Sequence, residues 1–277
     1  MVIHNDVITS RNNPTVKWAA SLSEKKSRAE YKCFIAEGEK LTYEAIGANL
    51  GVTHVFIRED RFESVIEKIK TAFGERHGEN CEVFVLSSSA FEKISTEKAP
   101  QGVISVIKYL DFFSNIDIIY KEEFFSDGNE RMLALYSLRD PSNLGSVIRS
   151  AVAFGVEHLV LSADTADIYN PKTVRSAMGS LFKVKVSIVG DFGKFVSSAR
   201  ECGRRVFAAE LTEKAISLAD ISLSAGDVFV IGNEGHGISS EISSLCTDSV
   251  YIPISAKTES LNASVAAALF MWEQNKI

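Results

Sequence analysis

The chain has 277 residues, of which 45% are hydrophobic and 24% are charged, and its formal net charge is −6. This length suits one large α/β domain or two modest ones, and the composition is ordinary for a soluble globular protein. The acidic balance argues against a protein that coats nucleic acid, but it is compatible with an enzyme that meets RNA through a local basic surface.

The sequence gives no support to membrane, secretory or metal-binding classes. Residues 1–18 have no apolar core behind a basic head, so they do not form a secretory signal. No apolar run is long enough to span a membrane. The four cysteines and five histidines lack the spacing of zinc ligands. We therefore predict a cytoplasmic protein with free, buried thiols and no metal site.

The first hundred residues alternate between strand and helix patterns. Apolar periodicity predicts helices over residues 14–28, 39–50, 62–73 and 88–95, and strands over residues 33–36, 52–57, 81–87 and 102–110. Such alternation predicts a small α/β domain, which we assign to residues 1–112. Residues 113–130 mix aromatic with acidic side chains and end in the turn sequence SDGNE, which favours a linker between two domains.

The alternation restarts more strongly after residue 131. We predict strands over residues 132–138, 157–163, 183–189, 204–211, 226–232 and 249–255, and helices over residues 141–155, 171–182, 192–203 and 239–246, before an alanine-rich final helix. This is the pattern of a doubly wound parallel sheet. We assign residues 131–277 to this second α/β domain.

Positive charge is concentrated near the amino terminus. The basic residues there are Arg11, Lys17, Lys25, Lys26, Arg28, Lys32 and Lys40. Glutamates are interleaved with them, so on charge alone a solvated helix face is the better interpretation. A local surface that contacts RNA is the alternative.

Two apolar strands near the carboxyl terminus each run into a loop of small and polar residues. VFVIG is followed by NEGHG, and SVYIPI is followed by a loop that contains KTESLNAS. Open α/β sheets bind ligands at this carboxyl edge, so we predict a pocket for a polar small molecule. The glycine loop lacks phosphate-loop spacing, and Glu234 within it suits a cationic or hydroxyl-bearing ligand better than a phosphate. A tight turn with Gly235 or Gly237 at positive φ is the simpler alternative.

The helix over residues 141–155 carries two candidate site residues. Its apolar stripe leaves Arg149 on the opposite side, next to an unusually small and apolar surface that another chain or a ligand could cover. Asn143 lies in the first turn, where its amide can cap the helix or present a donor and an acceptor to a ligand. On these local patterns alone, an exposed arginine and a capping asparagine are favoured.

Taken together, three motifs resemble those of the SpoU/TrmH branch of the SPOUT methyltransferases, which methylate a ribose 2′-hydroxyl of RNA. They are DPSNLGSVIRSAVAFG at 140–155, VIGNEGHGIS at 230–239 and IPISAKTESLNASVAAAL at 252–269. The segment NPKTVRSAMGSLF at 170–182 also resembles the family pattern, with Ala177 and Met178 where Ser and Ala are commoner. The amino-terminal half is similar to an L30e-like RNA substrate-binding domain, which makes the basic cluster an expected RNA contact.

The resemblance implies a carboxyl-terminal parallel-sheet SPOUT domain with a deep trefoil knot, although chains rarely thread loops. It also implies S-adenosylmethionine as methyl donor and no metal. The residues implied to bind the donor are Gly232, Asn233, Glu234, Gly235, Ile252, Ile254, Ser260, Leu261 and Asn262. The residues implied to bind RNA are Arg11, Lys17, Lys25, Lys26, Arg28 and Arg175.

The resemblance assigns catalysis to Arg149, together with Asn143, Glu234 and Asn262. A guanidinium with a pKa above roughly 12 is an awkward general base. We give equal weight to Arg149 binding a phosphate next to the target ribose and stabilising the developing alkoxide. The family places its active site at a homodimer interface, which would explain why Arg149 lies away from its own core stripe.

The leading hypothesis is therefore a cytoplasmic, homodimeric RNA 2′-O-methyltransferase. We expect 23S rRNA rather than tRNA as its substrate, a preference that depends only on the L30e-like domain. A tRNA methyltransferase is one alternative, and a non-catalytic RNA-binding factor of the same fold is another, which the presence of Asn143, Arg149 and Glu234 disfavours. A Rossmann-type enzyme would need an acidic residue after a first glycine loop, and none is found.

Overall fold

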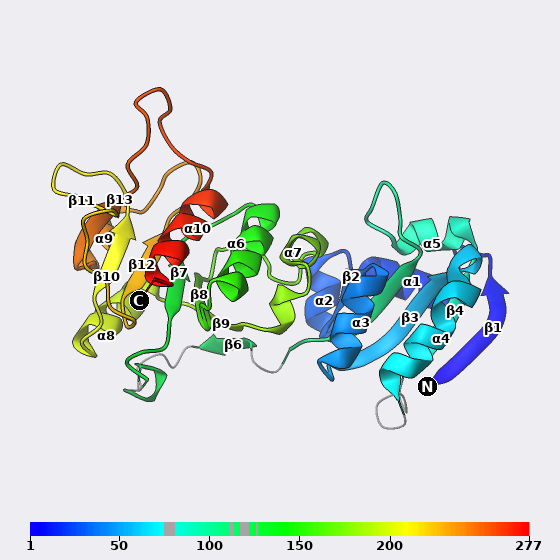
Figure 1. Ribbon diagram of the computed structural model, residues 1–277. Helices are drawn as coiled ribbons and strands as arrows, with labels where there is room; N and C mark the ends of the chain where they lie inside the picture. The colour runs from blue at the N-terminus through cyan, green and yellow to red at the C-terminus, as the bar shows by residue number, and fades with distance from the viewer. Residues whose placement is uncertain (75–80, 111–112, 117–121, 126, 277) are drawn as a thin grey trace. The chain divides into compact units, whose positions relative to one another are not determined.

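The computed structural model describes residues 1–74, 81–110, 113–116, 122–125 and 127–276. The chain forms two compact units, each built on its own sheet (Figure 1). The N-terminal unit consists of Met1–Leu110 and Asp167–Phe182. The C-terminal unit consists of Asp111–Ala166 and Lys183–Ile277.

A mixed five-stranded sheet forms the centre of the N-terminal unit, with the strand order β1-β4-β3-β5-β2. Its strands are β1 (Val2–Ile8), β2 (Cys33–Glu37), β3 (Val52–Arg58), β4 (Glu82–Leu86) and β5 (Val103–Lys108). β1 and β3 run parallel to β4, whereas β5 is antiparallel to β2 and β3. The sequence does not predict β1, because apolar and polar residues do not alternate along it as they do in a half-buried strand. The strand lies at the edge of the sheet, and its apolar residues Val2 and Val7 are exposed.

Helices cover both faces of this sheet. They are α1 (Pro14–Ser21), α2 (Lys25–Tyr31), α3 (Glu39–Gly47), α4 (Phe62–Phe73), α5 (Ser88–Ile94) and α7 (Pro171–Ala177). Helices α1 and α5 pack on one face, where Val16 and Phe91 join a core with Phe56 of β3. Helix α3 lies on the other face, since Thr42 on α3 bonds to Ser105, which alternates with the core residues of β5.

The single helix predicted over residues 14–28 is two helices, separated by a short turn. Buried Arg28 stabilises this turn by donating hydrogen bonds to the carbonyl oxygens of Leu22 (2.8 Å) and Ser23 (2.6 Å). Its Nη2 also lies 2.6 Å from Oδ2 of Asp167, and the residue is only 1% exposed. Arg28, expected to contact RNA, is therefore enclosed in the unit and is not available at its surface.

Residues 167–182 lie inside the predicted second domain but pack with the N-terminal unit. The ring of Tyr169 stacks on Tyr109 with centroids 4.0 Å apart, and its hydroxyl accepts a hydrogen bond from the Leu110 N–H (2.9 Å). Arg175 forms an ion pair with Glu97. The guanidinium of Arg175, another expected RNA contact, is thus already engaged by a carboxylate of the same unit.

The C-terminal unit is built on an eight-stranded sheet with the order β11-β13-β10-β12-β7-β8-β9-β6. Its strands are β6 (Phe113–Ile116), β7 (Met132–Leu135), β8 (His158–Ser162), β9 (Lys185–Val189), β10 (Val206–Ala209), β11 (Ile216–Ser217), β12 (Val228–Ile231) and β13 (Asp248–Tyr251). Every neighbouring pair is parallel, which confirms the predicted parallel α/β architecture. β6 belongs to this sheet although its residues fall in the range predicted as a linker. The trefoil knot stays a prediction.

Helices also cover both faces of the parallel sheet (Figure 1). On one face, α8 (Phe192–Glu201) and α9 (Ser240–Leu245) pack over a core that includes Val160 and Val228. On the other, α6 (Pro141–Ala153) packs against α10 (Ala263–Gln274), whose Phe270 ring lies 4.7 Å from that of Phe229. Because β7 and β12 are parallel neighbours, the loops that follow them emerge at the same edge.

In the part of the chain that the structure describes, no helix combines the length and the apolar character that crossing a membrane requires.

A buried polar cluster lies at the amino-terminal edge of the parallel sheet. Oε1 of Glu130 lies 2.9 Å from Nζ of Lys185, and its Oε2 lies 3.4 Å from Nδ1 of His158. Burial would raise the pKa of Glu130, but hydrogen bonds and charge interactions with His158 and Lys185 lower it to about 2. A carboxylate with a lowered pKa stabilises the folded state above its unfolded pKa and loses this contribution as the pH falls through the folded value.

We therefore expect Glu130→Gln to lower the free energy of unfolding by about 1–3 kcal/mol at pH 7. The difference from the unchanged protein should shrink as the pH falls from about 4.5 to about 2, because a protonated Glu130 no longer attracts Lys185. Urea unfolding at several pH values measures it. Glu213→Gln, at an exposed loop position of the same unit, is the control and should have little effect. A Glu130→Gln effect that does not vary with pH would contradict this account.

Candidate active site

The carboxyl edge of the parallel sheet carries a cavity of about 910 Å³. It is lined by the connection between β7 and α6, by the glycine loop after β12, and by Asn262 just before α10. The edge predicted from the strand–loop pattern therefore does hold a pocket. It is lined mostly by polar residues, and Asn143 lies 91 residues from Glu234 and 119 residues from Asn262 in the chain.

Asp140 caps the start of α6 and thereby frees Asn143. The Asp140 carboxylate accepts hydrogen bonds from the backbone N–H groups of Ser142 and Asn143, both at 2.8 Å. Pro141 follows at the first helical position, where its missing N–H is not needed. The capping role considered for Asn143 belongs to Asp140, so the Asn143 side chain can bond elsewhere.

The Asn143 amide joins the two loops that the sequence singles out. Its Nδ2 donates to Oε1 of Glu234 (3.0 Å), and its Oδ1 accepts from Nδ2 of Asn262 (3.0 Å). Asn262 in turn caps α10, because its Oδ1 accepts a hydrogen bond from the Ser264 N–H (2.9 Å). The structure thus brings together three of the four residues predicted to be catalytic.

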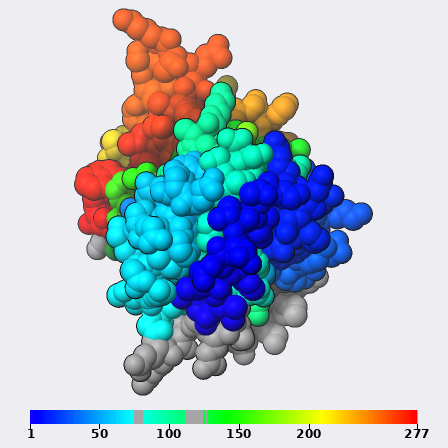
Figure 2. All heavy atoms as spheres, turned by 90° about the vertical axis from the view of Figure 1, so that its right-hand side faces the viewer, coloured from blue at the N-terminus to red at the C-terminus, as the bar shows by residue number. Residues whose placement is uncertain are grey.

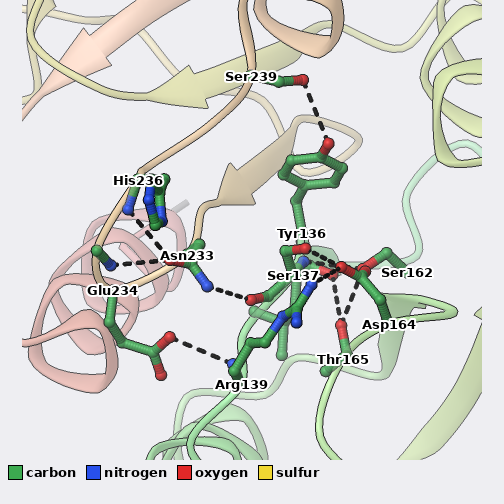
Figure 3. A network of polar contacts seen from close by, with 12 residues as sticks. Tyr136, Ser137, Arg139, Ser162, Asp164, Thr165, Asn233, Glu234, His236 and Ser239 are labelled. Atoms are coloured by element: carbon green, nitrogen blue, oxygen red, sulfur yellow. Dashed lines mark hydrogen bonds and ion pairs between the residues drawn. The ribbon is translucent and has the colours of Figure 1, made fainter.

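The carboxylate of Glu234 lies at the N-terminus of α6. It accepts hydrogen bonds from the backbone N–H groups of Arg139 and Asp140, both at 3.2 Å; Figure 3 shows the first of them. Burial would raise the pKa of Glu234, but the bonds from Asn143, Arg139 and Asp140 lower it below its usual value. The positive end of the helix dipole acts in the same direction. Glu234 is therefore ionised at neutral pH.

The glycine loop is a tight turn in which Asn233 and Gly237 exchange two backbone hydrogen bonds of 3.0 Å. Oδ1 of Asn233 accepts from the N–H groups of Gly235 (2.9 Å) and His236 (3.1 Å). Its Nδ2 donates to the carbonyl oxygen of Ser137 (2.7 Å), which ties the loop to the end of β7 (Figure 3). Of the two glycines considered for positive φ, Gly237 adopts it, at +66°. Asn233 therefore shapes the loop.

A second polar cluster beside the cavity is not predicted by the sequence (Figure 3). Ser137, at φ +57°, donates its N–H to Oγ of Ser162 (2.8 Å) and its hydroxyl to Asp164. Asp164 also binds Nη2 of Arg139 at 2.7 Å. Arg139 lines the cavity with a side chain that is 65% exposed. The position of Arg139 directly before the DPSN motif is the one sequence signal that could have identified it as a residue of the site. No local sequence pattern links Arg139 to Asp164.

Arg149 lies on α6 away from this network. It follows Asn143 by six residues, which turns it about 120° around the helix and moves it roughly 9 Å along the axis. The side chain is exposed and makes no hydrogen bond or ion pair within the described residues. Within one chain, the structure does not bring Arg149 to Glu234.

The other residues predicted to bind the donor divide between the two loops. Gly232 is half-buried at the end of β12, and Gly235 is exposed in the glycine loop. In the second loop, Ile252 and Leu261 are half-buried, whereas Ile254 and Ser260 are exposed. The residues that line the cavity include Asn262 from this second loop but not these four.

Within the described ranges, no group of three or more His, Cys, Asp or Glu side chains is arranged to hold a metal ion.

Gly232 is required where two backbone segments approach closely. A Cβ at this position would lie 2.5 Å from the carbonyl carbon of Gly237 and 2.7 Å from the nitrogen of Ile238. We expect Gly232→Ala to lower the free energy of unfolding by about 1–3 kcal/mol. Gly47→Ala is the control, since a Cβ there meets no atom within 4 Å, and it should be neutral or stabilising. Thermal and urea unfolding compare the two, and equal effects would contradict the assignment.

Comparison with known proteins covers both halves of the chain. The sequence pattern of the SpoU rRNA Methylase family matches residues 130–272. That of the MRM3-like substrate binding domain matches residues 13–105. Among solved structures, an AdoMet-bound rRNA methyltransferase from Sinorhizobium meliloti is similar at a TM-score of 0.80 with 28% identity, covering 99% of this chain and 98% of that one.

Two relatives match over nearly their whole length. The chain is 30% identical to the 23S rRNA (guanosine(2553)-2′-O)-methyltransferase RlmP of Bacillus subtilis, over 96% of this chain and 97% of the relative. It is 29% identical to the 23S rRNA (uridine(2479)-2′-O)-methyltransferase of Streptomyces viridochromogenes, over 96% and 90%. The chain therefore belongs to the SpoU rRNA Methylase family of S-adenosylmethionine-dependent enzymes, and it carries a substrate-binding domain in its N-terminal half.

Proposed function

We propose that this protein transfers a methyl group from S-adenosylmethionine to a ribose 2′-hydroxyl of 23S rRNA. The observation that carries the proposal is the hydrogen-bonded set of Asn143, Glu234 and Asn262 in a cavity at the sheet edge. The names of the two full-length relatives support 23S rRNA over tRNA. Because those relatives modify different nucleotides, we carry over the reaction and the RNA, and not the nucleotide.

The side chains around the cavity fit S-adenosylmethionine. Glu234 offers an ionised carboxylate to a positively charged sulfonium or ammonium group, and the amides of Asn143 and Asn262 offer further donors and acceptors. Ile252, Ile254 and Leu261 of the second loop lie outside this lining, so the proposal requires the adenine ring to extend from the cavity onto their apolar surface. When bound, this donor supplies an electrophilic methyl group.

We assign Asn143, Glu234 and Asn262 to positioning at the donor site, and Arg149 to the RNA. The exposed guanidinium of Arg149 can bind a phosphate next to the target ribose and stabilise the developing alkoxide. Because Arg149 makes no hydrogen bond or ion pair with this network among the described residues, we propose that it completes the site of a second subunit. The functional unit is then a homodimer with two shared sites.

An exposed apolar stripe on α10 supports this dimer. Val265, Leu269 and Trp272 follow one another at helical spacing and are 48%, 38% and 49% exposed. The ring of Trp272 also contacts Phe154, just after α6, with centroids 5.8 Å apart. Such a stripe marks an interaction surface, and a two-fold dimer would bury it twice. The stripe lies on α10, which begins at its cap residue Asn262. Helix α10 packs against α6, the helix that carries Arg149.

We place this activity in the cytoplasm. Cys33, Cys81 and Cys246 are buried free thiols, and Cys202 is an exposed one. Burial raises the pKa of Cys81 and of Cys246 to about 12, so these thiols stay protonated and unreactive. Free thiols of this kind are typical of a reducing compartment.

The first test separates donor binding from methyl transfer. We expect the unchanged protein to bind S-adenosylmethionine in calorimetry and to methylate a ribose of 23S rRNA. Arg149→Ala should bind the donor within about twofold of the unchanged protein and lose about 100-fold or more in methylation rate. Absence of donor binding would overturn the enzyme assignment. Methylation of tRNA in preference to 23S rRNA would overturn the substrate assignment.

The second test asks whether the site is shared between subunits. Arg149→Ala and Asn143→Ala are each expected to be inactive, but refolding an equal mixture should restore about a quarter of the unchanged activity. Half of the dimers would then be mixed, and each mixed dimer would contain one intact site. If Arg149 acts within its own chain, mixing restores nothing, and the shared site is refuted.

The third test addresses the apolar stripe. Trp272→Glu places a charge in the proposed interface, so we expect it to shift the protein from dimer to monomer in light scattering and to abolish methylation. Leu211→Glu is a matched control, because Leu211 is 78% exposed elsewhere in the same unit. The Leu211→Glu variant should stay dimeric. A Trp272→Glu variant that remains dimeric would exclude this surface.

A further inference from the structure

A second cavity, of about 460 Å³, lies on the N-terminal unit. Three elements bring cations to it: Arg11 from the turn before α1, Lys17 from α1 and Lys93 from α5. Helices α1 and α5 pack together, and Figure 2 shows the dark-blue N-terminal segment beside the teal segment to which α5 belongs. The remaining lining groups are Asn12, Ala20, Ser21, Ser23 and Glu24. The cavity is therefore polar and predominantly basic.

The three cations are not paired with any carboxylate of the described residues. Arg11, Lys17 and Lys93 are all exposed, and none forms an ion pair with another residue in the described part of the chain. Other arginines of the same unit are engaged: Arg28 pairs with Asp167, Arg58 with Asp60, Arg61 with Glu39 and Arg175 with Glu97. In a chain of net charge −6, unpaired cations gathered around a cavity indicate a site for an external anion.

The carboxylate of Glu24, which also lines this cavity, limits which kind of anion can bind there. Glu24 stands at the N-cap position of α2, yet its side chain makes no capping hydrogen bond, so its oxygens can accept from a ligand. A carboxylate would repel a di- or triphosphate, which carries several negative charges. A phosphodiester carries one, and in RNA it is adjacent to 2′-hydroxyl groups that donate hydrogen bonds. The cavity lies in the size range of small-ligand sites, which suits one unstacked nucleotide better than a duplex.

We propose that this cavity, the α1–α5 cavity, binds one sugar–phosphate step of unpaired substrate RNA. Arg11, Lys17 and Lys93 contact the phosphates on either side of one ribose, and Glu24 accepts a hydrogen bond from its 2′-hydroxyl. The inference rests on the proposed function and deepens it, because it gives the substrate-binding unit a defined RNA site. Arg28 and Arg175, which the sequence analysis also expected to contact RNA, take no part in this site.

The salt dependence of RNA binding tests the phosphate contacts. For single strands, each lost contact reduces the slope of log Kd against log salt by about 0.7, so Arg11→Ala/Lys17→Ala/Lys93→Ala should reduce it by about 2. Each single variant should reduce it by roughly 0.7, which keeps the test valid if the triple variant fails to fold. The probe is a single-stranded fragment of 23S rRNA. A triple alanine variant of the exposed Lys68, Lys98 and Lys214 is the control and should keep the slope.

The same variants also separate this site from the methyltransferase site. We expect the triple variant to bind S-adenosylmethionine normally and to raise the KM for RNA while leaving kcat unchanged. An unchanged slope and KM would overturn the α1–α5 cavity as an RNA site without touching the proposed function. Failure of the unchanged protein to bind S-adenosylmethionine would overturn the proposed function instead.

The role of Glu24 is tested with paired oligonucleotides. The unchanged protein should bind the RNA more tightly than the 2′-deoxy strand of the same sequence, and Glu24→Ala should reduce this preference by at least about fivefold. The variant removes no capping bond from α2, so the fold should persist. A Glu24→Ala variant that changes the affinity for both strands equally would overturn the ribose contact.

Discussion

One carboxamide, that of Asn143, holds the candidate active site together. Only a side chain that presents a donor and an acceptor at once can bond to the Glu234 carboxylate and to the Asn262 amide in the same arrangement. An aspartate at this position would repel Glu234, and an aliphatic residue would leave both neighbours without this partner. Asp140 contributes by capping α6 through the N–H groups of Ser142 and Asn143, so the Asn143 side chain is not used at the helix start.

Two helices, α6 and α10, begin at the cavity, and their dipoles make its electrostatic potential more positive. The N-terminus of α6 is satisfied by Asp140 and by Glu234, and the N-terminus of α10 is capped by Asn262. Both helix dipoles therefore present their positive ends at this edge of the sheet, where they favour an ionised Glu234. The negative charge that remains in the cavity is thus stabilised by the fold itself, before any ligand arrives.

The sequence predicts what depends on local periodicity and misses what depends on distant partners. The parallel sheet follows from buried apolar strands that alternate with helices, and the Asn143 and Glu234 motifs lie where the strand ends place them. The burial of Arg28 could not be predicted, because its carboxylate partner Asp167 lies 139 residues away in the chain. In the sequence, Arg28 lies in the same charged stretch as Lys25, which is exposed. Asp140 as the cap was predictable in principle, since Asp before Pro is a common helix start.

Pairing within the chain separates structural cations from those available to an anionic substrate. Arg139 lines the cavity, but its Nη2 already bonds to Asp164, and the charge of that carboxylate offsets part of the attraction between the guanidinium and an RNA phosphate. Arg149 has no competing partner among the described residues, so a phosphate contact there is opposed only by desolvation and side-chain entropy. The same criterion separates Arg11, Lys17 and Lys93 from Arg28 and Arg175 on the other unit. Basic residues near one another in sequence thus divide into two classes, and the division is set by which carboxylates the fold places within reach.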